Sequence, residues 1–454
     1  MQTAHVRLAA VLTATLAVSC WLGMPRAARG EIGILDNVPA ATLLVPWFEV
    51  DVGGGRTTLI SINNASDDIV LAHVTLWTEW WVPVLGFDVY LTGYDVHTIN
   101  LFDTIVFGDL PNTGPSNVLS PIGDFSGGPH TTFGGTCSTT PGTAPNYASL
   151  SGLSLQIVQQ SLRGQPRSSD GQCTALPGDT DLARGYLTVD AVSECADQHP
   201  NAVGYFVDGG QGTASNNNVL WGDYFLVDPA EDFAQGFTMV HIEADGFSLG
   251  VDDGSCDTVD RAPSTFYCTL RNPTTEPGED NREGLPSAYL TRYLQGGAFT
   301  GGTDLLVWRD KNGTGVGTAR SCATTPAPLE QNQIVVFDEQ ENPLVESLGP
   351  VIDPLPQPDP FPWGANRAEV GTDLTIDAPF GWLFLNLNTG SSFRQAAVAA
   401  VFSAEGRFSV GLDALAVNSS TLGADNRRGA RNPDPTLDEV PNPDAPTLFD
   451  GTVP

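Results

Sequence analysis

Residues 70–81 read VLAHVTLWTEWW, and this stretch decides the fold class. Apolar and polar residues alternate along it, and successive side chains of an extended strand point to opposite faces of a sheet. One face is apolar and belongs to a core: Val70, Ala72, Val74, Leu76 and Trp80. The other face mixes polar groups with two indoles: His73, Thr75, Trp77, Glu79 and Trp81. The alternation predicts a β-strand.

Segments of similar composition lie on both sides of this stretch. They are rich in valine, isoleucine, leucine, threonine and aromatic residues and cover 42–50, 57–64, 84–92, 96–106, 185–192, 219–227 and 237–244. Turns rich in glycine, proline or asparagine separate them. Closely spaced turns without intervening helices predict a mostly β protein built as an antiparallel β-sandwich. The turn NNASDD at 63–68 resembles the opening hairpins of immunoglobulin-like modules in bacterial surface proteins, a resemblance that implies no functional residue.

The length of 454 residues favours two domains. We expect a first sandwich over 31–250, with a loop-rich insertion at about 110–181 that contains one helix near 150–162. A second β domain, a second sandwich, is expected over 285–420. It begins with a short helix over 286–294 and continues with strands at 304–308, 333–338, 373–376, 382–387, 396–403 and 407–416. Residues 426–454 alternate Asn, Pro and Asp and predict a disordered acidic tail.

The first 30 residues have the features of a signal peptide. Arg7 closes a basic start, an apolar run follows, and Ala28 and Gly30 form a small-residue cleavage site before Glu31. We therefore expect a secreted, periplasmic or cell-surface protein. The stretch 16–20 also resembles a lipobox, so the alternative is a lipoprotein anchored through Cys20. No later segment reaches the roughly 20 apolar residues of a transmembrane helix, which predicts no integral membrane span.

The charge and the cysteine content indicate which partners and which covalent cross-links to expect. The chain has 20 Lys and Arg against 53 Asp and Glu, so nucleic acid is not an expected partner. Six cysteines remain after the signal peptide: Cys137, Cys173, Cys195, Cys256, Cys268 and Cys322. In an exported chain an even number predicts disulfides. The pairing we expect is Cys256 with Cys268, Cys137 with Cys173, and Cys195 with Cys322.

A binding surface is expected where 70–81 and 84–92 pair as a hairpin. Its members are His73, Trp77, Glu79, Trp81, Asp88 and Tyr90. Aromatic rings beside carboxylates suit a glycan or protein ligand at the cell surface. Read as a carboxylate pair, Glu79 and Asp88 suggest glycoside hydrolysis instead. The third interpretation, which we favour for the rings, is that the insertion or the second domain covers them and gives them a structural role.

Calcium is the cofactor with the clearest sequence signal. Asp310, Asn312 and Thr314 occupy the first, third and fifth positions of DKNGTG, with Gly315 sixth, as in the opening of an EF-hand loop. No acidic residue stands at the twelfth position, and a second acidic loop surrounds Cys256. The segment 246–250, GFSLG, matches the GxSxG pattern, but the six histidines are scattered along the chain, so we do not interpret it as a serine hydrolase site. We therefore expect a secreted or surface-associated, non-catalytic structural or binding protein; the alternative is a secreted hydrolase acting on glycans or peptides.

Overall fold

The computed structural model describes residues 37–111, 117–119, 145–147, 149–177, 181–196, 198–206, 212–244, 265–270, 280–311, 317–331, 333–348, 360–374, 376–389, 394–404 and 408–416. The predicted signal peptide and tail, Cys137, Cys256, Asn312 and Thr314 lie outside these residues. The mostly β prediction is confirmed, because strands dominate and the large sheets are antiparallel. No helix in the described ranges is long and apolar enough to cross a membrane.

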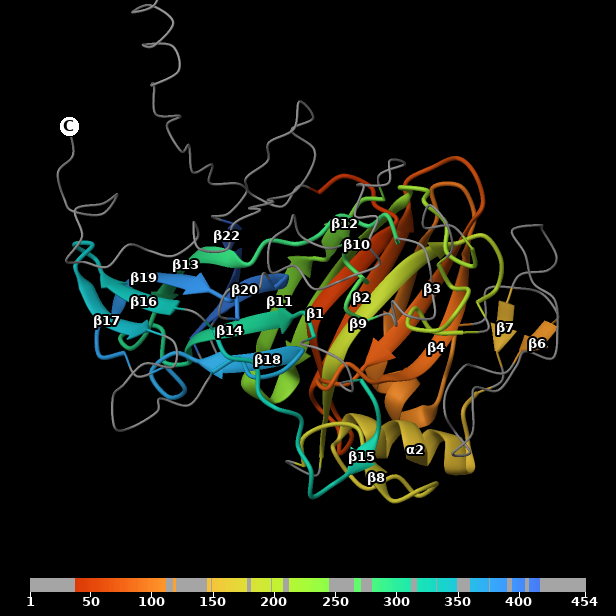
Figure 1. Cartoon of the computed structure of the whole chain (residues 1–454), viewed down its shortest axis with the longest axis horizontal. Helices are drawn as coiled ribbons and strands as arrows, with labels where there is room; N and C mark the ends of the chain where they lie inside the picture. The colour runs from red at the N-terminus through yellow and green to blue at the C-terminus, as the bar shows by residue number, and fades with distance from the viewer. Residues whose placement is uncertain are drawn as a thin grey trace, which may run out of the picture. The chain divides into compact units, whose positions relative to one another are not determined.

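Residues 42–242 form two antiparallel sheets (Figure 1). The five-stranded sheet has the order β12 (Val240–Ile242), β1 (Thr42–Asp51), β9 (Leu182–Val192), β3 (Val70–Trp77), β4 (Pro83–Leu91). The four-stranded sheet has the order β11 (Phe233–Thr238), β10 (Leu220–Asp228), β2 (Thr57–Asn64), β5 (Val96–Asn100). A π-helical turn, η1 (Asp103–Phe107), follows β5, and the short η3 (Pro229–Glu231) joins β10 to β11.

Residues 288–416 supply two further antiparallel sheets. One has the order β17 (Pro343–Leu348), β16 (Gln333–Asp338), β19 (Phe380–Asn386), β13 (Ala288–Leu294), β22 (Leu415–Ala416). The other has the order β18 (Ala365–Glu369), β14 (Gly302–Arg309), β20 (Ala396–Ala404), β21 (Phe408–Asp413). Two short pairs complete the sheets, β15 (Arg320–Ser321) with β8 (Gln172–Cys173) and β6 (Asn117–Leu119) with β7 (Pro145–Tyr147).

The two central strands of the second of these sheets, β14 and β20, are buried on both faces. Along β14, Leu305 and Val307 pack into a core with β13, β16 and β19, whereas Leu306 and Trp308 pack into the core of residues 40–285. The run AAVAAVF at 396–402 divides its side chains between the two cores in the same way. Continuous apolar runs of this kind are typical of strands without a solvent-facing side. The core of the first two sheets therefore extends into the second half of the chain.

The hairpin of β3 and β4 forms as predicted, with Val70 opposite Leu91 and His73 opposite Asp88. The strand ends four residues earlier than expected, because 78–82 form a tight turn. The backbone N–H of Thr78 donates to the oxygen of Val82, and that of Trp81 donates to the oxygen of Thr78. Trp81 has a left-handed φ of 59°. Strict alternation therefore does not extend to Trp80 and Trp81.

Three other segments differ from the sequence expectations. The helix expected over 286–294 is wrong, because 288–294 form strand β13, in which Tyr289, Thr291 and Tyr293 alternate inward as β-forming side chains do. The segment 96–106 leaves the sheet at Asn100 and continues into η1. The turn 63–68 is not a hairpin turn, because β2 and β3 belong to different sheets. In the described part of 373–376, which omits residue 375, Leu374 forms an isolated bridge, and β18 was not expected.

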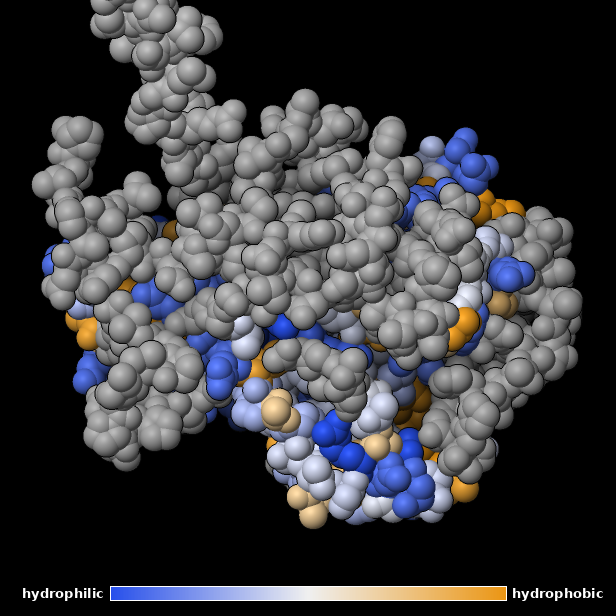
Figure 2. Space-filling view, viewed as in Figure 1, coloured by the Kyte–Doolittle hydropathy of each residue, from blue (hydrophilic) through white to orange (hydrophobic). Residues whose placement is uncertain are grey.

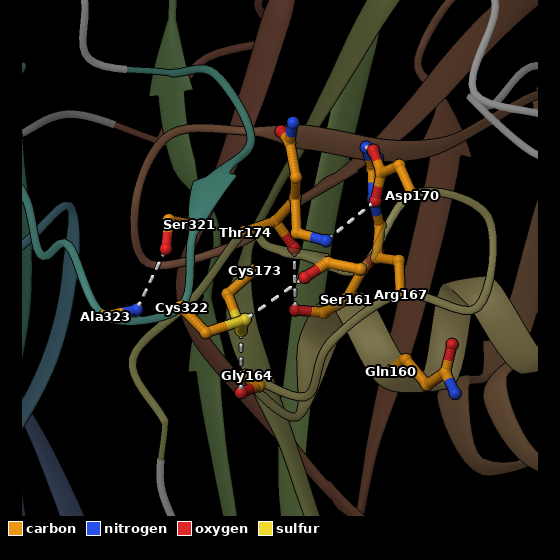
Figure 3. The surroundings of a disulfide bond; sticks show 12 residues. Gln160, Ser161, Gly164, Arg167, Asp170, Cys173, Thr174, Ser321, Cys322 and Ala323 are labelled. Carbon is orange, nitrogen blue, oxygen red and sulfur yellow. Dashed lines mark hydrogen bonds and ion pairs between the residues drawn. A yellow bond between two sulfur atoms is a disulfide. The ribbon is translucent and has the colours of Figure 1, made fainter.

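The insertion contains the expected helix, α2 (Gly152–Leu162), which contacts β4 and β9. Beside it, Cys173 of β8 is bonded to Cys322 next to β15 (Figure 3). The predicted pairs Cys137 with Cys173 and Cys195 with Cys322 are therefore wrong, since spacing along the chain does not report which strands meet in space. Cys195 and Cys268 are also disulfide-bonded. Figure 2 shows a mainly hydrophilic surface over α2, β8 and β15.

Candidate functional site

Most residues of the predicted binding surface are buried. His73 and Asp88 are inaccessible to solvent and form a contact of 2.8 Å between Nδ1 and Oδ1. Trp77 is equally buried, stacks on Tyr186 and donates from Nε1 to the hydroxyl of Thr188. Tyr90 is partly buried against the same core. These side chains are therefore part of the interior and present no platform to a ligand.

A polar network around Asp190 lies on the same face of this sheet. The carboxylate of Asp190 accepts hydrogen bonds from the hydroxyls of Thr42, Tyr205 and Tyr267. Arg282 donates from Nε to the hydroxyl of Thr42 and lies over the ring of Phe206. All members of the network are buried, and buried charges are tolerated when hydrogen bonds satisfy them. This network fixes the segments that cover the sheet.

Glu79 and Asp88 lie in different parts of the hairpin. Asp88 lies opposite His73, and the four-residue rise from His73 to Trp77 at the end of β3 is about 13 Å. Glu79 lies beyond that end, in the turn. Paired glycosidase carboxylates are about 5 to 10 Å apart. The two carboxylates therefore belong to different environments.

Glu79 instead lines a cavity of about 250 Å³, which we call the Trp363 cavity. Its aromatic and apolar wall consists of Trp47, Leu176, Pro360, Pro362, Trp363 and Ala365. Its polar wall consists of Glu79, Arg184, Asn366, Arg367 and Asp373. Glu79 accepts the backbone N–H of Leu176 through Oε1 and pairs with Arg184 Nε at 3.0 Å through Oε2. Asp373 and Arg367 are the exposed members of the lining, and we call this exposed side the mouth.

The charged groups of this cavity are already engaged in ion pairs. The lining includes the carboxylates of Glu79 and Asp373 and the guanidinium groups of Arg184 and Arg367. Burial raises the pKa of Glu79 above its ordinary value, although Arg184 and the Leu176 N–H favour the charged form. Arg184 pairs with Glu79, and Arg367 pairs with Glu49 and Asp304, so protein carboxylates offset both guanidinium charges.

Contacts with neighbouring side chains hold parts of the lining of the Trp363 cavity in place. The side chain of Asn366 accepts the backbone N–H of Trp363 and donates to its backbone oxygen. A small apolar cluster joins Trp80, Val82 and Cys173 with Leu176, Cys322 and Trp363. The hydroxyl of Thr78 donates to the backbone oxygen of Thr174, beside the disulfide. The disulfide and Trp80 therefore support two residues that line the cavity.

A second cavity, of about 270 Å³, shares Arg367 with the first, and we call it the ion-pair cavity. A chain of alternating charges lines it: Asp228, Arg56, Glu49, Arg367 and Asp304. Burial raises the pKa of Asp304, against the effect of Arg367. Among the described residues no group of three His, Cys, Asp or Glu side chains is placed to hold a metal ion. The ion pairs that line this cavity are partly buried and connect β1 with β14 and β18.

Of the predicted calcium ligands only Asp310 lies in the described ranges. Its carboxylate is almost fully buried and accepts hydrogen bonds from the hydroxyl of Thr269, the Lys311 N–H and the side chain of Gln395. The calcium loop therefore remains a prediction, and Asp310 has protein partners of its own.

Sequence reasoning identified Glu79 but not the other residues of the Trp363 cavity. Trp47 lies within β1, Arg184 within β9, and Trp363 at the end of a proline-rich stretch. The aromatic content of 351–363 was the available signal, but nothing in the sequence places that stretch beside Glu79. Comparison with known proteins finds no matching family model, no matching curated protein and no matching solved structure.

Proposed function

We propose that this chain is a secreted or surface-associated binding protein without catalytic activity, and that its ligand occupies the Trp363 cavity. The observation that supports this function is the lining of the cavity, in which the ring of Trp363 lies with Arg184 and with Asp373 at the mouth. Concave sites with an apolar wall and a few converging polar groups are typical of ligand pockets.

A binding role agrees better than catalysis with the hydrogen bonds and ion pairs that the polar groups of the cavity already make. Glu79, the carboxylate with a raised pKa, is held by Arg184 and by the N–H of Leu176. A general acid has to present its proton to the substrate. Both oxygens of Glu79 are already bound to protein groups, so its role is to orient the arginine and the segment at Leu176.

A secreted hydrolase is the second candidate. It is favoured by one observation, the raised pKa of Glu79 in a cavity that contains a second carboxylate, Asp373. In that mechanism Glu79 would act as the acid and Asp373 as the base or nucleophile. The two candidates differ in whether a bound ligand is cleaved.

The test incubates the exported chain with panels of soluble glycans and peptides. Binding is measured by calorimetry, and cleavage is measured by mass spectrometry of the same mixtures. We expect saturable binding of at least one ligand without cleavage. Cleavage that is lost in the Glu79→Gln variant would establish the hydrolase. Absence of binding to both panels would contradict the binding function.

Export is tested separately. Mass spectrometry of the mature protein should give a chain that begins at Glu31. A lipid-modified chain that begins at Cys20 would favour the lipoprotein alternative.

A further inference from the structure

We propose that the Trp363 cavity binds a single ring of a neutral carbohydrate. This inference rests on the proposed binding function and names the class of ligand. It is argued from the size of the cavity, the chemistry of its walls and the pairing of its charged groups.

The size suits one sugar ring. The cavity of about 250 Å³ equals roughly eight liquid waters at about 30 Å³ each, enough for one pyranose. Pockets for drug-sized ligands start at about 300 Å³. A longer glycan would therefore place one residue inside and extend the rest past Asp373 at the mouth.

The walls offer both kinds of contact that a pyranose makes. One face of a sugar ring carries C–H groups, and these stack on an indole such as that of Trp363. The hydroxyls of the sugar both donate and accept hydrogen bonds. Arg184 supplies the donors: within the described part of the chain its Nε pairs with Glu79, which leaves the two terminal nitrogens of the guanidinium group for a ligand. The carboxylate of Asp373 supplies an acceptor.

The charges disfavour anionic ligands. Both guanidinium groups of the lining are already paired with carboxylates, Arg184 with Glu79 and Arg367 with Glu49 and Asp304. The chain as a whole is strongly acidic and repels anions at long range. A neutral polyol avoids this repulsion.

The cavity is also pre-organised. Asn366 fixes both backbone groups of Trp363, and Glu79 holds Arg184 on one side and Leu176 on the other. A site whose walls are fixed before binding loses less conformational entropy when the ligand arrives.

The experiment titrates the exported chain with neutral hexose and N-acetylhexosamine oligosaccharides, with uronic acid oligosaccharides, and with peptides. The variants are Trp363→Ala and the milder Asp373→Asn, which alters an exposed side chain whose Oδ2 accepts the backbone N–H of Glu369. The matched control is Trp382→Ala, which removes a partly buried indole of β19 outside the cavity. Circular dichroism confirms folding of each variant.

We expect neutral oligosaccharides to bind, at least tenfold weaker binding in Trp363→Ala, a severalfold loss in Asp373→Asn, and less than a twofold change in Trp382→Ala. Stronger binding of uronic acids or peptides would overturn the ligand class and leave the binding function standing. Neutral glycan binding that neither cavity variant weakens would overturn the site alone. No binding to any panel would defeat both proposals.

Discussion

The indole Nε1 of Trp81 lies 2.8 Å from the backbone oxygen of Arg309, to which it donates a hydrogen bond. This bond joins the turn after β3 to the last residue of β14, across 228 positions of the sequence. The same ring lies over Gly364, whose backbone N–H donates to the oxygen of Glu79. A tryptophan expected on the polar face of the first hairpin is therefore an anchor for the second half of the chain.

Alanine at Gly364 should destabilise the protein by about 1 to 3 kcal/mol, as overpacking in a core does. Its Cβ would lie 2.5 Å from Trp81 Nε1, so the ring has to move and its bond to Arg309 weakens. Urea unfolding measures the change. A double-mutant cycle with Trp81→Phe serves as the control. If the cost of Gly364→Ala is the same in both backgrounds, the clash with the indole is not its cause.

Trp77→Ala should cost about 3 to 5 kcal/mol of stability. The side chain is fully buried, stacks on Tyr186 and donates to Thr188, so its removal leaves a void and removes one hydrogen bond of the Thr188 hydroxyl. Thermal and urea unfolding report the loss. The comparison is Phe225→Ala, where the ring is 44% exposed and the expected cost is smaller. A Trp77→Ala variant of nearly unchanged stability would show that the face of β3 is not a core.

Loss of the disulfide between Cys173 and Cys322 should lower stability by about 2 to 5 kcal/mol, because it closes a long loop of the unfolded chain. The paired variant Cys173→Ser with Cys322→Ser tests this by urea unfolding. Peptide mapping without reduction should first recover a cross-linked peptide that contains both cysteines. Recovery of Cys173 joined to Cys137 would contradict the observed pairing.

Stability should depend on pH through Asp310. Burial raises the pKa of Asp310 to about 6, although the hydroxyl of Thr269 favours the charged form. The folded state binds this proton more tightly than the unfolded state, where the pKa is about 3.9. The stabilisation that comes from protonated Asp310 is therefore fully present below about pH 4 and is lost as the pH rises to about 6. Two units correspond to about 3 kcal/mol.

The matched variant for that prediction is Asp310→Asn, which cannot titrate. Relative to it, the wild type should lose free energy of unfolding between pH 4 and pH 7, by up to about 3 kcal/mol. A difference that stays flat, or rises with pH, would contradict the assignment.

The strands were predictable where side-chain alternation or β-forming composition is local. Residues 57–64 and 333–338 form strands with the expected bounds, and α2 forms near the expected helix. The helix expected at 286–294 was wrong because tertiary packing of Tyr289 and Tyr293 overrides a weak helical signal at Pro286. The spacing of apolar residues along the chain does not reveal such packing.

The candidate site was predictable only in part, because its members come from distant segments. Glu79 was a candidate because aromatic residues surround it in the sequence. Arg184 lies beside it because of the strand order in the sheet, and Trp363 lies beside it because of the fold of the second half of the chain. The burial of Trp81 depends on Arg309 and Gly364, which no local pattern connects to it. Long-range contacts of this kind are determined by topology rather than by spacing.

The position of β1 has a consequence for the order in which the chain folds. Its neighbours β9 and β12 are synthesised well over a hundred residues later, and its Glu49 pairs with Arg367 across 318 positions. At about 5 to 20 residues per second, that last partner follows roughly 16 to 60 s after β1. The strand neighbours of β1 are complete by residue 242, about half of the chain. An apolar strand without neighbours is prone to aggregate. The chain is therefore most exposed to aggregation before β9 and β12 become available to β1.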